Sequence, residues 1–87
     1  MANHAQAAKR ARQTVKRAAR NRHIRTTMRT HVKRLNACIE GGDAAAAKEA
    51  LRLAVKHLDR AVVRGIVHRR TASRTISRLT VAVNKLG

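Results

Sequence analysis

The chain has 87 residues, enough for one small domain with a limited hydrophobic core. Its 21 Lys and Arg face only 4 Asp and Glu, so the formal net charge is +17 and a polyanionic partner is expected. The absence of Phe, Tyr and Trp argues against base-by-base reading of single-stranded RNA on aromatic platforms. Recognition of the phosphate backbone and shape of double-helical segments is the alternative.

Targeting signals are weak. No apolar run approaches the length of a membrane span or forms a signal-peptide core. The first thirty residues are Arg-rich and acid-free, as in a mitochondrial transit peptide. However, only Met1 and Val15 are large aliphatic residues before residue 24. Two such residues are too few for the amphipathic face of an import signal. The single Cys38 cannot form an internal disulfide, which fits a reducing compartment, so a cytoplasmic protein is expected.

Glycine and aspartate mark the expected helix ends. The chain has no Pro, and Gly41, Gly42 and Gly65 are the internal glycines. Because Gly favours the left-handed turn that ends a helix, these positions divide the chain, and Asp43 is a good N-cap for the run that follows. The pattern predicts an all-α fold with three helices, roughly at residues 5–40, 44–63 and 69–86.

Each expected helix carries apolar residues at spacings of three or four, which places them on one helical face. Three such stripes joined by short loops predict an antiparallel three-helix bundle. The stripes are Ile24, Met28, Val32, Leu35 and Ile39, then Ala44, Ala47, Leu51, Val55, Leu58 and Val62, then Ala72, Ile76, Leu79, Val83 and Leu86.

The first stripe begins only at Ile24, so the residues before it have charge but little to bury. We therefore divide the chain into a basic N-terminal arm, residues 1–23, and a three-helix bundle, residues 24–87. As a helix, residues 5–23 would extend ~28 Å beyond the bundle. Because an unsupported charged helix is marginal in water, we expect the arm to fray in the free protein and to become helical on its partner.

Basic residues also recur every four positions, as in Lys48, Arg52, Lys56, Arg60 and Arg64. The three helices contain ten such like-charged pairs, which together cost roughly 2–5 kcal/mol, comparable with what a small core supplies. Exposed helix faces usually carry both positive and negative side chains. Here only two ion pairs are expected, Glu49–Arg52 and Lys56–Asp59. These faces are therefore expected to bind phosphate rather than to be merely solvated. The excess of Arg over Lys, 15 to 6, supports this, because a guanidinium group can donate two hydrogen bonds to one phosphate.

Catalytic and metal chemistry find little support. The five His and Cys38 contain no C-x-x-C or H-x3-H pair, Cys38 is interpreted as a small core filler, and no pair of acids is placed for acid/base work. Gly41-Gly42 lacks the strand and the Lys-Ser/Thr of a phosphate loop. We expect no enzyme activity, cofactor, metal or small-molecule substrate.

The chain resembles the bacterial small-subunit ribosomal protein S20 family over nearly its whole length. The resemblance rests on a collinear set of short matches rather than on any one of them. These are Met1-Ala2-Asn3-His4, Lys9-Arg10, Arg12-Gln13, Arg20-Asn21, Arg29-Thr30, Lys33, Gly42-Asp43, Asp59, Gly65-Ile66-Val67-His68, Ala72, Arg74, Ser77-Arg78-Leu79, Asn84 and Leu86.

The resemblance implies a three-helix bundle that binds 16S ribosomal RNA in the body of the small subunit, aids its assembly and catalyses no reaction. The long first helix would lie among RNA helices of the 5′ domain and near the long penultimate stem. No homo-oligomer is expected. Ile76 belongs to the third stripe but stands where the family commonly has Lys, so both the core and its rim are open for this residue.

The RNA-binding residues expected from charge and from the resemblance are phosphate clamps and a few polar side chains that could reach bases or 2′-hydroxyls. A histone-like DNA-compacting protein is the alternative, although no wedge residue is visible. A cationic membrane-active helix would need a broad apolar face in the arm, which is missing. The expected site residues are Asn3, Lys9, Arg10, Arg12, Arg20, Asn21, Arg25, Arg29, Lys33, Arg64, His68, Arg69, Arg70, Arg74 and Arg78.

Overall fold

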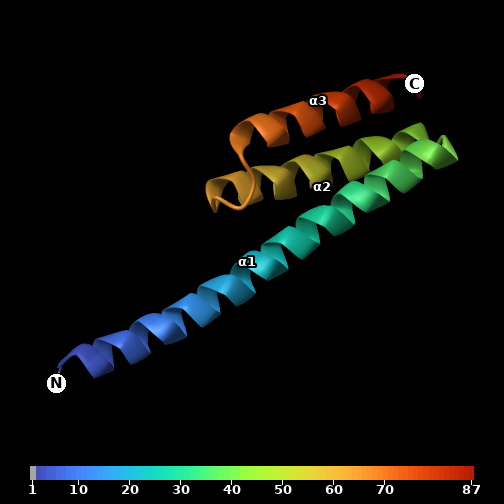
Figure 1. Cartoon of the computed structure of the whole chain (residues 1–87). Coiled ribbons are helices and arrows are strands. Elements are labelled where there is room, and N and C mark those ends of the chain that lie inside the picture. Colours follow the sequence, from blue (N-terminus) through green and yellow to red (C-terminus); the bar gives the residue numbers. More distant parts are fainter. Residues whose placement is uncertain (1) are drawn as a thin grey trace.

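The structure is a computed structural model that describes the backbone of residues 2–87 and the side chains of residues 4–87. It confirms the all-α fold: α1 (Ala2–Gly41), α2 (Ala44–Val63) and α3 (Arg69–Asn84) run in alternating directions, and the long N-terminal helix extends well beyond the other two (Figure 1). No strand occurs between residues 2 and 87. None of the helices in this part of the chain is long and apolar enough to cross a membrane.

Local signals place both turns. The Asp43 carboxylate accepts a hydrogen bond from the Ala46 amide at 3.1 Å, which confirms the expected N-cap of α2. Gly42 and Gly65 adopt φ of +73° and +72°, the left-handed region in which Gly has no Cβ penalty. At Gly65 the paired bonds from Gly65 N to Val62 O and from Ile66 N to Ala61 O form a Schellman motif.

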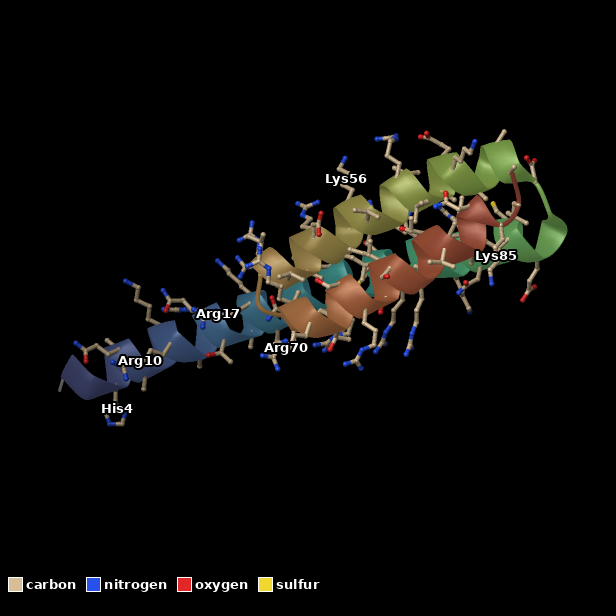
Figure 2. All side chains as sticks on the ribbon, turned by 90° about the horizontal axis from the view of Figure 1, so that it is seen from above. His4, Arg10, Arg17, Lys56, Arg70 and Lys85 are labelled. Atoms are coloured by element: carbon tan, nitrogen blue, oxygen red, sulfur yellow. The ribbon has the colours of Figure 1, made fainter. Side chains whose placement is uncertain are left out.

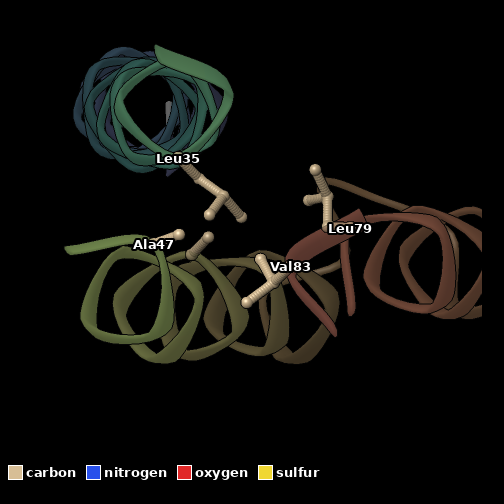
Figure 3. Close-up of a cluster of buried hydrophobic side chains, with 5 residues drawn as sticks. Leu35, Ala47, Leu79 and Val83 are labelled. Carbon is tan, nitrogen blue, oxygen red and sulfur yellow. The ribbon is translucent and has the colours of Figure 1, made fainter. Parts of the chain in front are cut away.

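Helix α2 is the centre of the fold, because it packs against both α1 and α3, while α1 and α3 contact each other little. Side chains from all three helices converge on one small core (Figure 3). Leu35 and Val83 are its largest fully buried members. The other members of that core are Ala47, Ala54 and Leu79.

The apolar stripes are only partly the core. Ala54 and Ala61 on α2 are fully buried although the stripe omitted them, because small side chains let two helices approach the middle helix closely. Several stripe residues expected in the core are only half-buried, although four of them, Val32, Ile39, Leu51 and Leu86, pack against the buried cluster. The half-buried stripe residues are Met28, Val32, Ile39, Ala44, Leu51, Val55, Val62, Ile76 and Leu86. Ile76, which the stripe placed in the core and the family resemblance placed at the rim, is half-buried.

The molecule is elongated, with extents of 65 × 21 × 14 Å. Side chains of residues 4–20 are all exposed, Val15 among them at 69 %, and Ile24 is the first buried side chain of α1. The chain exposes 6681 Å², whereas a compact protein of 9.6 kDa exposes roughly 5,100 Å². The surplus surface lies largely on the N-terminal half of α1, which contacts no other helix in Figure 1.

Candidate nucleic-acid interface

Basic side chains cover the molecule on several sides rather than on one patch. In Figure 2 Lys56 on α2 and Arg70 at the start of α3 lie on opposite flanks, with Arg10 and Arg17 along the arm. Among residues 4–87, the only salt bridge joins Arg52 to Glu49, with 2.6 Å between Nη2 and Oε1. The expected Lys56–Asp59 pair is wrong, so the positive charge is even less compensated than the sequence indicated.

A cationic pocket of about 130 Å³ forms where the arm leaves the bundle. On α1, Arg20 and His23 lie three residues apart, and the antiparallel α2 brings Arg60 and Arg64 to the same place. His57, one turn before Arg60, completes the wall. The remaining lining residues are Ile24 and Thr27, so three arginines and two histidines meet at this pocket without a carboxylate.

The pocket continues along the arm. Arg20 also lines a neighbouring shallow depression with Gln13, Lys16 and Arg17. We call this continuous line of side chains the cationic track, and it consists of Lys16, Arg17, Arg20, His23, His57, Arg60 and Arg64. Its geometry fits a chain of phosphates, because successive charges pass from the solvated arm into a pocket between two helices.

Burial and neighbouring positive charge favour the neutral form of the His57 imidazole. Partial burial lowers the pKa of His57, and the cationic neighbours His31, Lys56 and Arg60 lower it further. A phosphate placed in the pocket would oppose these neighbours and favour the imidazolium form.

Asn21 lies next to this pocket along α1 and has an unusual environment. It is half-buried, and its Oδ1 is fully buried without a hydrogen-bond partner among residues 4–87. A buried acceptor left unpaired costs about 1–3 kcal/mol. Asn21 is one of three polar side chains, with Asn3 and His68, that the sequence predicted as contacts to bases or 2′-hydroxyls, and its Oδ1 lacks a donor in the free protein.

The structure brings some predicted residues together and leaves others apart. Arg20 and Arg64 share the cationic pocket, and Arg29 and Lys33 line one groove between α1 and α3. Arg69 lines a different hollow, which Asp59 also lines. Exposed side chains that line neither the pocket nor the groove are Lys9, Arg10, Arg12, Arg25, Arg70, Arg74 and Arg78. The Asn3 side chain lies outside the described residues.

His68 has a structural role that the sequence did not predict. Its Nδ1 accepts a hydrogen bond from the Arg70 amide at 3.1 Å and so caps the N-terminus of α3. With Nδ1 acting as acceptor, the proton of the neutral ring is on Nε2, and the side chain is exposed. His68 therefore caps a helix and still offers one N–H to a partner.

Five members of the cationic track were not among the expected site residues, namely Lys16, Arg17, His23, His57 and Arg60. Lys16 and Arg60 were visible in the four-residue ladders, but a ladder does not show which of its rungs faces another helix. Arg17 lies on a face of the arm without a core to orient it, and His23 and His57 belong to no metal-ligand pair, so their spacing indicated no role for them. Only the packing of α1 on α2 brings His23 and Arg60 together.

Comparison with known proteins identifies relatives along the whole chain. Ribosomal protein S20 is the family whose sequence model matches, over residues 2–84. The small ribosomal subunit protein bS20 of Geotalea uraniireducens (strain Rf4) is 53% identical over 87 residues, which cover 100% of both chains. The protein of the same name from Solidesulfovibrio magneticus (strain ATCC 700980 / DSM 13731 / RS-1) is 52% identical over 85 residues, covering 98% of this chain and 96% of that one.

Proposed function

This chain belongs to the ribosomal protein S20 family, and from that premise we propose that it is a structural protein of the small ribosomal subunit that binds 16S rRNA directly and aids subunit assembly. It would act in the cytoplasm, within the body of the subunit, as a monomer and without catalysis.

The observation that supports this proposal best is the cationic track. Three arginines and two histidines from α1 and α2 surround one small pocket without an answering acid, at the base of a fully exposed basic helix. Bringing such charges together is unfavourable unless an anion joins them. Phosphates of a folded RNA would supply several anions at once, along the arm and into the pocket.

Recognition would rest on backbone and shape. The elongated arm, 65 Å long together with the bundle, suits insertion between neighbouring RNA helices rather than contact with one base. Double-helical RNA is recognised mainly through its phosphates, 2′-hydroxyls and shape, for which aromatic stacking platforms are unnecessary. The absence of Phe, Tyr and Trp is consistent with this mode.

Two measurements test the proposal. The tagged chain, expressed in a bacterium, should sediment with the small-subunit peak of a sucrose gradient, and its absence from that peak would remove the proposal. Purified chain should also bind a 16S rRNA transcript more tightly than duplex DNA of equal length at the same salt concentration. Equal or tighter binding to DNA would favour the histone-like alternative.

A further inference from the structure

A second feature of the surface is an open groove between α1 and α3, which we call the α1–α3 groove. It has a volume of about 640 Å³, within the range of roughly 300–1,000 Å³ typical of small-ligand sites. Its floor is apolar and consists of Met28, Val32, Leu58 and Val67. Leu58 is almost completely buried, while the other three are half-buried, so part of this floor remains accessible.

The walls of the groove differ from its floor. On the α1 side Arg29 and Lys33 stand one turn apart, and both are exposed. On the α3 side the wall is formed by the hydroxyl-bearing Thr71 and Thr75. None of the residues that line the groove is acidic. The groove thus combines an apolar floor, hydrogen-bonding hydroxyls and two cations.

Charge and shape together select the occupant. The cations disfavour a basic protein segment and favour an anion, but phosphate and sugar alone would leave the apolar floor uncovered. A nucleotide has both parts, since the faces of its base are apolar and its phosphate is anionic. Paired bases cannot present a face to such a floor, because their faces are stacked inside the helix.

We propose that the α1–α3 groove holds a single unpaired nucleotide of RNA, with its base on the floor formed by Val32 and Val67 and its phosphate against Arg29 and Lys33. This inference rests on the proposed function. It adds one base-binding site to an interface that otherwise contacts the phosphate backbone of the RNA. Thr71 and Thr75 supply hydroxyls to the edge of the base. The groove needs no aromatic platform, because aliphatic side chains cover one face of the base.

The test fills the groove without changing its charge. The double substitution Thr71→Leu and Thr75→Leu places aliphatic side chains over the floor, and the matched control Val81→Leu changes a residue of α3 that is 52 % exposed and does not line the groove. Binding to a 16S rRNA transcript should weaken about tenfold for the double variant, the scale of one lost base contact, with an unchanged salt slope. Val81→Leu should bind as the unsubstituted chain does.

A crosslinking experiment identifies the occupant directly. Benzoylphenylalanine at position 75, in small subunits reconstituted with the full chain, should crosslink to an unpaired nucleotide of 16S rRNA, and the same group at position 81 should not reach that nucleotide. If the double variant, with its fold verified by circular dichroism, bound the transcript as tightly as the unsubstituted chain, the inference would be wrong. It would also be wrong if position 75 crosslinked only to paired nucleotides or to a neighbouring protein. If the unsubstituted chain failed to bind the transcript at all, the proposed function would fail first.

Discussion

The imidazole rings of His31 on α1 and His57 on α2 stack face to face, with centroids 4.2 Å apart and planes inclined by 9°. Both residues are half-buried, and His57 also lines the cationic pocket. The stack therefore joins the contact between the two helices to the place where an anion would bind. In a chain without Phe, Tyr or Trp, it is the one aromatic stacking pair among residues 4–87.

The stability of the free protein should fall on mild acidification because of His57. Since the pKa of His57 is lower in the fold than in the unfolded chain, where it is about 6.5, the unfolded state binds more protons just below that pH. The contribution of neutral His57 to the free energy of unfolding is fully present above pH ~6.5. It decreases as the pH falls toward the lower pKa of the folded state. Urea unfolding of His57→Gln between pH 5 and 8 should show a weaker pH dependence, whereas His4→Gln, on the exposed arm, should behave as the unsubstituted chain. Equal slopes for both variants would contradict this role of His57.

Arg60 should contribute to RNA binding more than Arg52 does, although both are exposed arginines on α2. Arg60 lines the cationic pocket, whereas Arg52 is already held by the Glu49 carboxylate. Arg60→Gln should weaken binding to 16S rRNA and lower the salt slope by about one, the effect of one lost phosphate contact. Arg52→Gln removes the same charge and should change the slope much less. Filter binding at several salt concentrations measures both, and indistinguishable slopes would argue against a phosphate at Arg60.

The free protein should be less stable with Asn21 than with an apolar residue at that position. Asn21→Leu removes the buried, unpaired Oδ1 and extends the apolar stripe by one position before Ile24, so the free energy of unfolding should rise by about 1 kcal/mol. Asn84→Leu, at the exposed end of α3, is the control and should change stability by less than about 0.5 kcal/mol. If Asn21 also contacts RNA, the same variant should bind 16S rRNA more weakly. A destabilised Asn21→Leu protein would mean that the amide already has a partner in solution.

Two glycines should respond to alanine in opposite directions. The Cβ of an alanine would meet no atom within 4 Å at either Gly41 or Gly65, so backbone conformation alone decides the result. Gly41 is helical, and Gly41→Ala should stabilise the fold by about 0.5 kcal/mol. Gly65 has φ of +72°, so Gly65→Ala should destabilise it by about 1 kcal/mol. Thermal unfolding compares the two, and a shift of the same sign for both would refute this account.

The arm should be the least protected part of α1 in the free protein. Residues 4–20 bury no side chain, so their helical hydrogen bonds depend on local propensity alone. Amide hydrogen exchange should be fast there and slow around Leu35, and binding to 16S rRNA should slow exchange in the arm. Protection of the free arm equal to that around Leu35 would show that the helix is stable without RNA.

Local signals in the sequence were sufficient for the helix ends. The Gly42-Asp43 pair and Gly65 bound α2 at Ala44 and Val63, as expected, because a left-handed glycine and an N-cap act within a few residues. Helix α3 ends at Asn84, two residues earlier than expected, and α1 begins at Ala2 rather than at residue 5. Helix ends without a marked stop signal were thus predicted less well.

Which apolar residues form the core could not be read from their spacing. Ala54 and Ala61 belong to a chain with many alanines, and burial of an alanine depends on which helix approaches it. Met28 and Val32 have the spacing of core residues, yet both are only half-buried and line the α1–α3 groove, although Val32 also packs against the buried cluster. Periodicity identifies a face but not the neighbour that covers it.

The sequence by itself determined the charge, the three helices, the exposed basic arm and the family, because these depend on composition, on local turn chemistry and on collinear short matches. Only the tertiary structure decided which charges meet. Arg20 and Arg64 are 44 positions apart, and they share a pocket with His23 and Arg60 because α1 and α2 pack antiparallel with small alanines between them. Contacts between distant residues follow from the register of that packing, which no local pattern encodes.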